Sequence, residues 1–146
     1  MEIRKLSKDD VDAFASLIHI FKDVFEVKAA MPGDAYLQNL LRNPDFMVFV
    51  VKQDELIVGG LTIYVLHHYY DTRPMAFIYD VAISSAFQRQ GFGKALMAQV
   101  RSHCHAHGFA EIFVEAEADD PDAIEFYRRT KMHKEMAVVQ FSDAMD

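Results

Sequence analysis

AFIYDVAISSAFQRQGFGKAL, residues 76–96, carries the strongest structural signal in the chain. Its first eight residues, 76–83, form a run of apolar and β-branched residues that predicts a buried strand. Apolar residues then recur at helical spacing and predict one buried helix face, formed by Phe92, Leu96, Val100 and Cys104. Gly91 and Gly93 lie where the loop after this strand meets the start of the helix. The stretch therefore predicts a strand, a glycine-containing loop and the N-terminus of a helix.

The loop before that helix suits a negatively charged ligand. The first turn of a helix leaves backbone amides without intrahelical partners, and these favour an anion. Missing side chains at Gly91 and Gly93 let phosphate oxygens reach those amides, while Arg89 and Lys94 add positive charge. The spacing matches neither a Walker loop nor a dinucleotide loop, which needs a third glycine where Leu96 stands. A phosphate or pyrophosphate site and a helix start that only packs on the sheet both stay open.

The remaining segments predict a single α/β domain, because 146 residues suffice for one full core. Apolar runs and alternation predict strands at 2–6, 46–51, 56–66, 76–83, 110–117 and 135–141. Capping residues and helical spacing predict helices from an N-cap at Ser7 to about residue 25, over about 34–41, up to about Gly108, and from Pro121 onward. Gly59 and Gly60 indicate a bulge or a close backbone approach. This order predicts a mixed, mostly antiparallel sheet of about six strands with helices on both faces.

Composition narrows the functional classes. A formal net charge of −7 argues against a nucleic-acid phosphate backbone as partner, and it leaves cationic substrates open beside a role in solubility alone. Cys104 is the only cysteine, so no intrachain disulfide can form. No apolar run reaches the roughly 18 residues of a membrane span, and the N-terminal residues are too polar for a secretory signal. We expect a soluble cytoplasmic protein.

Two motifs at a suitable separation carry a family resemblance. QRQGFG (88–93) resembles the Q/R-x-x-G-x-G/A signature of the GNAT superfamily of N-acetyltransferases, and it follows a strand and a short loop as in that family. DPDAIEFYRRTKM (120–132) resembles the later motif, in which an A-x-x-x-Y helix carries a tyrosine beside the thiol of coenzyme A. Four further stretches resemble the GNAT-type aminoglycoside 3-N-acetyltransferases: 34–46, 57–66, 77–83 and 115–127.

This resemblance implies a sheet that splays at its central parallel pair and a site for acetyl-coenzyme A. The backbone of three strand residues would pair with the pantetheine arm: Val81, Ala82 and Ile83. Seven residues would cradle the pyrophosphate: Gln88, Arg89, Gln90, Gly91, Phe92, Gly93 and Lys94. Asp120 stands where the family often has an asparagine that contacts the cofactor, and Lys131 stands where a glycine commonly ends the later helix.

Two catalytic residues are predicted, Tyr127 from the resemblance and Asp80 from its position in the sequence. Tyr127 would protonate the departing thiolate; without the motif it would be a core tyrosine at helical spacing with Ala123 and Thr130. Acetyl transfer needs a neutral amine, so the ammonium proton requires an acceptor. Asp80 lies inside an apolar strand, where it is predicted to bind the ammonium and take its proton, or to be a structural acid held by backbone amides. Its neighbour Tyr79 is a predicted substrate contact.

Acidic residues gather after the glycine loop. Residues 111–122 contain six carboxylates and no lysine or arginine, and by period two Glu111, Phe113, Glu115 and Glu117 share one strand face. This concentration suits a substrate with several ammonium groups, and Glu115, Glu117 and Asp119 are its predicted contacts. The alternative is a solvated strand end in which Asp119 or Asp120 caps the next helix.

Together these observations predict direct transfer of an acetyl group from acetyl-coenzyme A to an amine of a polycationic aminoglycoside, at the 3-amino group, which would confer antibiotic resistance. A covalent intermediate on Cys104 is not expected, because that cysteine lies on the core stripe. We expect no metal, since no carboxylate completes a site with His103 and His107, and by analogy with relatives we expect a homodimer. The alternatives are a GNAT enzyme for a polyamine, a small amine or a peptide N-terminus, and a noncatalytic acyl-coenzyme A sensor.

Overall fold

The structure is a computed structural model that describes residues 1–146, and it divides into two compact units, residues 1–115 and residues 116–146. The first unit contains β1 (Glu2–Lys5), α1 (Val11–Phe25), α2 (Asp34–Arg42), β2 (Phe46–Gln53), β3 (Leu56–Leu66), β4 (Met75–Ile83), the 3₁₀ turn η1 (Ser85–Phe87), α3 (Phe92–Ala106) and β5 (Glu111–Val114). The second contains α4 (Pro121–Arg129). None of these helices is both long enough and apolar enough to span a bilayer.

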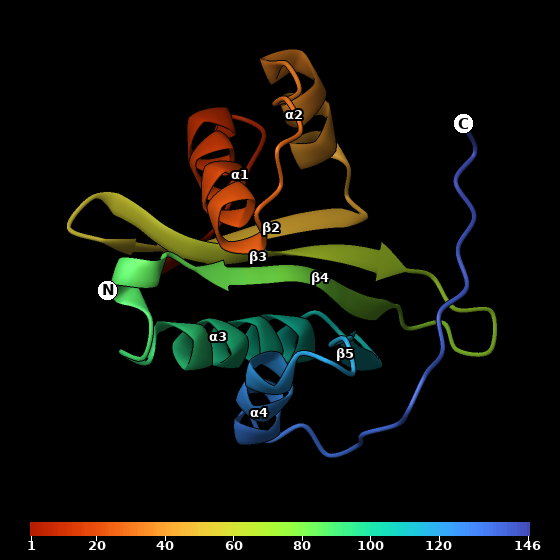
Figure 1. Cartoon of the computed structure of the whole chain (residues 1–146). Coiled ribbons are helices and arrows are strands. Elements are labelled where there is room, and N and C mark those ends of the chain that lie inside the picture. The colour runs from red at the N-terminus through yellow and green to blue at the C-terminus, as the bar shows by residue number, and fades with distance from the viewer. The chain divides into compact units, whose positions relative to one another are not determined.

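The first unit is built on one five-stranded sheet in the order β1-β2-β3-β4-β5 (Figure 1). The first four strands pair antiparallel, and β4 and β5 pair parallel. That parallel pair is short: Met75–Ile78 of β4 lie against Glu111–Val114, and β4 then continues to Ile83 without β5 beside it. The predicted mixed, mostly antiparallel sheet that splays at its parallel pair is confirmed.

The sheet has five strands because the sixth predicted strand does not form. Residues 135–141 lie in no helix or strand, although their apolar pattern is that of a strand. A strand needs a neighbour to satisfy its backbone groups, and this segment has none in the sheet.

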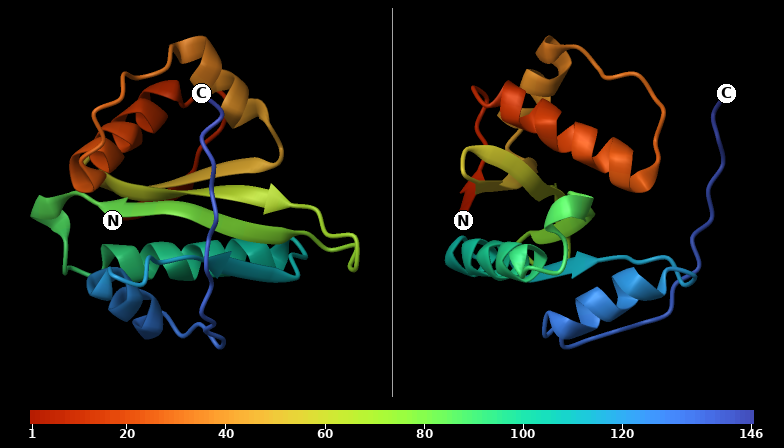
Figure 2. Two further views of the ribbon diagram at one scale, coloured as in Figure 1. Left: turned by 45° about the vertical axis from the view of Figure 1, so that its right-hand side comes forward. Right: turned by 60° about the vertical axis from the view of Figure 1, so that its left-hand side comes forward.

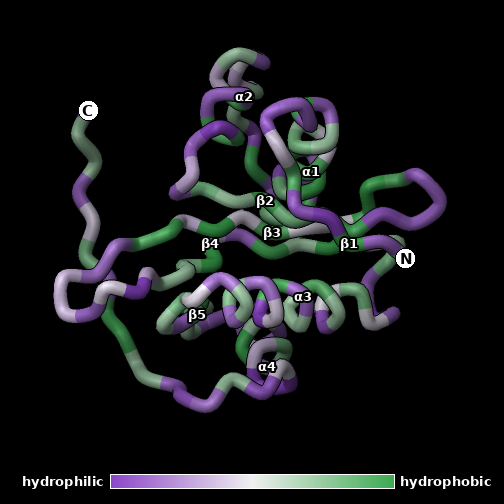
Figure 3. Tube along the Cα trace, turned by 180° about the vertical axis from the view of Figure 1, so that it is seen from behind, coloured by the Kyte–Doolittle hydropathy of each residue, from purple (hydrophilic) through white to green (hydrophobic).

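Helices cover both faces of this sheet, as predicted. α1 and α2 lie on one face and α3 lies on the other in every view (Figures 1 and 2). α3 alternates between hydrophilic and hydrophobic residues along its length (Figure 3). Its predicted apolar stripe is buried, with Leu96 and Val100 fully inaccessible to solvent and Cys104 nearly so. α1 buries Phe14, Leu17 and Phe21 in the same way.

Strand β2, which lies between β1 and β3, is buried on both of its faces. Val48 and Val50 pack into the core beneath α1 and α2, whereas the ring of Phe49 lies 5.3 Å from that of His103 on α3. Residues 46–51 are therefore all buried, and the strand reads as a continuous apolar run instead of alternating.

Gly59 and Gly60 allow two close approaches in β3, and the predicted bulge is also present. A Cβ at Gly60 would meet the carbonyl oxygen of Phe49 and would lie 2.9 Å from Leu17 Cδ1. A Cβ at Gly59 would lie 2.6 Å from the carbonyl oxygen of Ala82. The β2–β3 register shifts beside these glycines, between Val51 and Lys52.

The N-cap predicted for the first helix is wrong by three residues. The N-cap of α1 is Asp10, although its side chain makes no hydrogen bond to the helix. Its carboxylate instead accepts hydrogen bonds from the amide (2.7 Å) and the hydroxyl (3.1 Å) of Ser7 and closes a turn before the helix. The same hydrogen bond from the Ser7 amide lowers the pKa of Asp10. Ser7 is thus the donor in a turn rather than the acceptor at a helix start.

In the second unit, α4 begins as the sequence predicts. Pro121 opens the helix, and the Asp120 carboxylate accepts from the amide of Ala123 at 3.1 Å. The helix ends at Arg129, and Lys131 takes the left-handed conformation, with φ of 65°. This is the conformation that glycine adopts most easily, so Lys131 fills the role of the glycine that commonly ends this helix.

Candidate active site

A β-bulge in β4 creates the most distinctive feature of the sheet. Leu61 pairs with Val81 and Ile63 pairs with Ile78, so two residues of β4, Tyr79 and Asp80, stand opposite Thr62 alone. Successive strand residues normally point to opposite faces, and a bulge re-aims one of them. Tyr79 and Asp80 consequently both line the same cavity.

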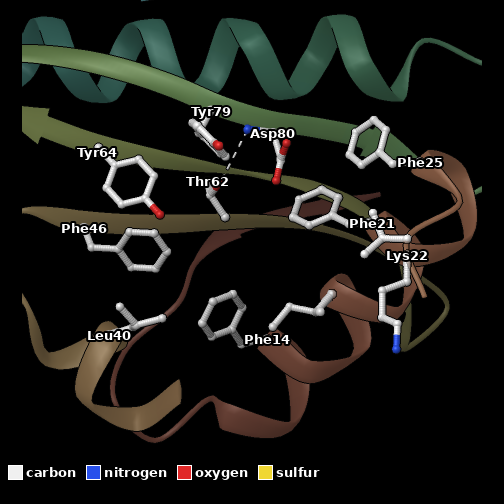
Figure 4. Close-up of a pocket in the computed structure, with 12 residues that line it drawn as sticks. Phe14, Phe21, Lys22, Phe25, Leu40, Phe46, Thr62, Tyr64, Tyr79 and Asp80 are labelled. Carbon is white, nitrogen blue, oxygen red and sulfur yellow. Dashed lines mark hydrogen bonds between the residues drawn. The ribbon is translucent and has the colours of Figure 1, made fainter. Parts of the chain in front are cut away.

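This cavity has a volume of about 260 Å³ and lies on the face of the sheet that α1 and α2 cover (Figure 4). Its apolar wall comes mainly from α1 and the segments around it: Phe14, Ile18, Phe21, Phe25, Val27, Leu40 and Phe46. Its polar residues are Lys22, Thr62, Tyr64, Tyr79 and Asp80. A concave, mostly apolar pocket with a few converging polar groups is typical of a small-molecule site.

Asp80 is the acidic group of this cavity. Its backbone amide donates to Thr62 Oγ1 at 3.3 Å, and its carboxylate accepts no hydrogen bond from the protein. The alternative of a structural acid held by backbone amides therefore lacks its required donors. Burial raises the pKa of Asp80, and no neighbouring cation offsets that effect. A half-buried, unpaired carboxylate of this kind can bind an ammonium group and can accept a proton.

Aromatic rings form a continuous wall beside Asp80. The Tyr64 ring lies 5.2 Å from Phe46 and 5.4 Å from Tyr79, the latter in an edge-to-face arrangement. Burial raises the pKa of Tyr64, with smaller contributions from Tyr79, Asp80 and Tyr36. Tyr79 is a predicted substrate contact, whereas Tyr64 was not predicted, because its spacing near the end of β3 carries no distinct signal.

The phenylalanines of α1 contribute to both the core and the cavity. Helical spacing predicted this helix, and Phe14 and Phe21 on it are buried. The same two residues also line the cavity, together with the more exposed Phe25. Helical spacing identifies a buried face but cannot distinguish packing on a sheet from packing around a cavity.

The glycine loop has the conformation of a helix N-terminus with free amides. Gly91 is the N-cap of α3 with φ of 87°, and the first amide bonded back to it is that of Ala95. The amides of the first turn, residues 92–94, thus have no intrahelical acceptor. A Cβ at Gly91 would meet nothing within 4 Å, so glycine is needed there for its left-handed backbone rather than for space.

The two glutamines of the loop hold the loop itself. The Gln88 side-chain amide donates to the carbonyl of Ile83 at 2.9 Å, and that of Gln90 donates to the carbonyl of Ala86 at 3.4 Å. The side chain of Phe92 is buried, so only its backbone faces the loop. Arg89 and Lys94 are exposed and add positive charge beside the free amides.

One edge of β4 is open next to this loop. Val81, Ala82 and Ile83 pair with β3 on one side, whereas β5 has already ended at the level of Ile78 on the other. Strand residues beyond a splay present unpaired backbone groups, which an extended chain of amides can satisfy. This is the edge predicted to pair with the pantetheine arm.

The predicted acidic strand face is wrong in its extent. β5 ends at Val114, so Glu115 and Glu117 follow the strand instead of continuing its period-two face. Within the strand, Phe113 stacks on Phe77 with ring centroids 4.8 Å apart. Glu115, Glu117 and Asp119 are exposed, and Asp120 takes the capping role that the alternative interpretation expected of Asp119 or Asp120. Strand propensity could not reveal this early end, because the ladder stops where β4 and β5 separate.

Tyr127 lies in α4, four residues after Ala123, as the A-x-x-x-Y motif requires. Its ring lies edge-on to that of Phe126, with the centroids 5.1 Å apart and an interplanar angle of 67°, and its carbonyl accepts from the amide of Thr130 at 3.1 Å. Its assignment as general acid stays a prediction.

Cys104 lacks the properties of a nucleophile. It is 2% exposed, and burial raises the pKa of its thiol to about 11. Only the thiolate attacks a thioester, and at neutral pH this thiol stays protonated. His103 and His107 stack at 4.0 Å, and no group of three side chains of metal-ligand type gathers there or elsewhere.

Comparison with known proteins places this geometry in a family. Residues 14–131 match the acetyltransferase (GNAT) family, so the chain belongs to the GNAT family of N-acetyltransferases. This confirms the resemblance that the glycine loop and the later helix carried.

The chain is similar over its full length to an aminoglycoside acetyltransferase, meta-AAC0020, from an uncultured soil metagenomic sample. The crystal structure of that protein in complex with trehalose is 42% identical, covers 99% of this chain and 96% of its own, and superposes with a TM-score of 0.97. Its complex with sisomicin is 41% identical with the same coverage and TM-score. A curated relative, the histone acetyltransferase GCN5 of Debaryomyces hansenii, is 24% identical over 94% of this chain, which spans only 29% of that protein.

Proposed function

We propose that this enzyme transfers an acetyl group from acetyl-coenzyme A to an amine of an aminoglycoside, and specifically to the 3-amino group. The observation that carries the substrate class is the full-length similarity, at 41% identity, to an aminoglycoside acetyltransferase crystallised with sisomicin. In the cytoplasm this reaction would remove a positive charge from the drug and would confer resistance.

Asp80 supplies the proton acceptor of the proposed reaction. The reactive amine must lose a proton before its lone pair can attack the thioester carbonyl carbon. The Asp80 carboxylate accepts that proton, directly or through one water. Its raised pKa makes it a stronger base than an exposed aspartate. The same partial burial makes the ionised carboxylate less favourable before the amine arrives. The new C–N bond then forms as the C–S bond breaks, in a ternary complex without an enzyme-bound acetyl group.

Tyr127 completes the proton balance in this proposal. The departing coenzyme A thiolate takes the phenolic proton of Tyr127, and the tyrosine is reprotonated from solvent as products leave. Cys104 takes no part, because its thiol is buried and protonated.

The cofactor fits the open backbone groups of the first unit. The pantetheine amides would pair with the free edge of Val81, Ala82 and Ile83, and the pyrophosphate would accept from the first-turn amides of α3. Arg89 and Lys94 would neutralise its charge, whereas Gln88 and Gln90 act by holding the loop. One carboxylate oxygen of Asp120 accepts a hydrogen bond from the Ala123 amide, so any cofactor contact from Asp120 would use its second carboxylate oxygen.

Exposed carboxylates would attract the polycation. Glu115, Glu117 and Asp119 are exposed and carry no salt bridge, so they can accept ammonium groups of a substrate that also contacts Tyr79. Such exposed attraction weakens as ionic strength rises.

A coenzyme A release assay over three amine panels tests the proposal. Aminoglycosides including sisomicin, linear polyamines and short peptides are compared at low and at 0.5 M salt, with mass spectrometry and NMR of the product to locate the acetyl group. We expect turnover with aminoglycosides at the 3-amino group and a KM that rises with salt. Faster turnover of a polyamine or a peptide would overturn the substrate class. Tight cofactor binding without thiol release from any amine would instead identify a noncatalytic sensor.

A further inference from the structure

The cavity beside Asp80 carries little charge for a site whose proposed substrate is a polycation. Among its lining residues only Asp80 is acidic, and Lys22 adds one positive charge. The other polar residues, Thr62, Tyr64 and Tyr79, contribute hydroxyl groups. A second ammonium group inside the cavity would find no second carboxylate, and an unpaired charge in apolar surroundings is costly. The cavity itself therefore complements a single ammonium group.

The apolar wall of the cavity is partly exposed at its rim. Figure 4 shows Phe21 and Phe25 on one side of Asp80 and the rings of Tyr64 and Tyr79 on the other. Phe25, Tyr64 and Tyr79 are 44%, 41% and 57% exposed, and the Phe25 ring stacks on that of Phe21 with centroids 5.8 Å apart. Exposed aromatic residues that gather around a cavity are typical of a ligand-binding groove. A ligand with an apolar body would remove these rings from water.

The size of the cavity limits what it can enclose. Its volume of about 260 Å³ lies below the roughly 300–1,000 Å³ of pockets that enclose a drug-sized ligand. One aromatic ring or a short alkyl chain, together with its amine, is a smaller guest of the right polarity. An aminoglycoside would place only the ring that bears the reacting amine near Asp80 and would leave its other rings outside.

We propose that the enzyme has a second activity, the acetylation of primary monoamines whose body is a single aromatic ring or a short alkyl chain. The body lies against Phe21 and Phe25, and the ammonium group binds Asp80. This activity rests on the acetyl transfer proposed above and adds an acceptor class to it. The amine gives one proton to Asp80, and its lone pair forms the C–N bond as the C–S bond of acetyl-coenzyme A breaks. The departing thiolate takes its proton from Tyr127, as in the proposed reaction.

A homologous series of amines tests the apolar wall. Propylamine, butylamine, pentylamine and hexylamine have nearly the same basicity and differ in apolar length, and 2-phenylethylamine adds a ring. Each methylene group that is buried should raise kcat/KM about three- to fourfold in the coenzyme A release assay, until the cavity is full. 1,6-Diaminohexane has the length of hexylamine and a second ammonium group, so its kcat/KM should be at least about tenfold lower. No turnover of any monoamine, no dependence on chain length, or equal turnover of the diamine would overturn this activity.

Phe25→Ala tests where the apolar body lies. This change removes part of the wall at a half-exposed position, so the ratio of kcat/KM for hexylamine to that for propylamine should fall about tenfold. A ratio cancels any general loss of active enzyme. Leu56→Ala is the control, because Leu56 is a similarly exposed apolar residue that does not line the cavity, and the ratio should stay unchanged. An unchanged ratio in Phe25→Ala would show that the body does not bind this wall.

Sisomicin in the same assay separates the two acceptor classes. Turnover of sisomicin without turnover of any monoamine would overturn the second activity and would leave the proposed function intact. Turnover of hexylamine without turnover of sisomicin would support the second activity and would overturn the proposed substrate class. Salt gives an independent readout, because screening weakens attraction between exposed charges and leaves apolar burial intact. We therefore expect the KM for hexylamine to change less than about twofold up to 0.5 M salt; a steep rise would count against apolar binding.

Discussion

The amide of Asp80 donates a hydrogen bond to the hydroxyl of Thr62 across the β3–β4 pair, at 3.3 Å. A strand amide normally donates to a carbonyl of the neighbouring ladder, but the bulge removes that acceptor from Asp80. The Thr62 side chain, which is buried, supplies the replacement. This contact therefore lies at the bulge that directs Asp80 and Tyr79 to the same cavity.

Replacing Thr62 by valine removes the acceptor and keeps the shape. We expect Thr62→Val to lower the free energy of unfolding by about 1–2 kcal/mol, because it leaves a part-buried amide without a partner. It should also lower kcat/KM several-fold, since the position of Asp80 is no longer held. Denaturant unfolding and the coenzyme A release assay measure both effects. Thr62→Ser keeps the hydroxyl and should restore activity; equal activity of the valine and serine variants would argue against a positioning role.

Asp80→Asn tests the proton acceptor. An amide has nearly the same shape as the carboxyl group but cannot take a proton, so kcat/KM should fall by about 10²–10⁴-fold. The activity of the unmodified enzyme should rise with pH as Asp80 ionises, and this limb of the pH profile should disappear in the variant. Asp54→Asn, an exposed change in the β2–β3 turn, serves as control. Comparable activity of the two variants would exclude Asp80 as the base.

Asp80 should also make stability depend on pH. The pKa of Asp80 in the folded chain lies above 3.8, the ordinary value that applies to the unfolded chain. At a pH between 3.8 and the folded-state pKa, the unfolded chain has lost a proton that the folded chain retains. The folded state then binds more protons, and its stability falls as pH rises through that interval. Asp80→Asn has no such proton. The free energy of unfolding of the variant minus that of the unmodified chain should therefore be larger at pH 7 than at pH 4, which means that the variant gains relative stability as pH rises. The opposite trend would mean that the Asp80 pKa is lowered.

Gly91→Ala tests the left-handed start of α3. Space is available for the methyl group, so the expected cost of about 1–2 kcal/mol comes from backbone conformation alone. If the loop turns to avoid that strain, the first-turn amides move and the KM for acetyl-coenzyme A rises about tenfold. Gly33→Ala is the matched control, because Gly33 is equally open but has no positive φ. Unchanged cofactor affinity in Gly91→Ala would separate this loop from the pyrophosphate.

Tyr127→Phe removes the phenolic proton and keeps the ring. We expect kcat to fall by about 10²-fold or more while the affinity for acetyl-coenzyme A, measured by calorimetry, changes little. A thioester with a more acidic thiol needs less help at the leaving group, so an activated acyl donor should recover part of the lost rate. Full activity with acetyl-coenzyme A would leave Tyr127 as a packing residue.

Much of the fold followed from local patterns. The strand at 76–83, the helix with Leu96 and Val100 on its buried stripe, and a helix cap at Asp119 or Asp120 are each predicted from residues within about one turn or one strand. The GNAT family followed from two short motifs. The failures also have local reasons: Ser7 and Asp10 can each cap a helix, and only the turn that joins them selects Asp10.

Other features depended on contacts between distant segments. Strand propensity extended β5 to residue 117 and proposed a strand at 135–141, but a strand persists only where a neighbour pairs with it. β5 ends where β4 separates from it, and the last segment has no neighbour within its own sheet. The aromatic cavity likewise combines residues from α1, α2 and three strands.

The sequence by itself determined the family, the glycine loop and the presence of an acid in an apolar strand, because each depends on residues close together in the chain. Only the tertiary structure decided where that acid points. The register between β3 and β4 places two residues opposite Thr62. This mismatch directs the side chains of both Asp80 and Tyr79 toward the same cavity. Register is set by packing across the whole sheet, so no pattern within residues 76–83 could reveal it.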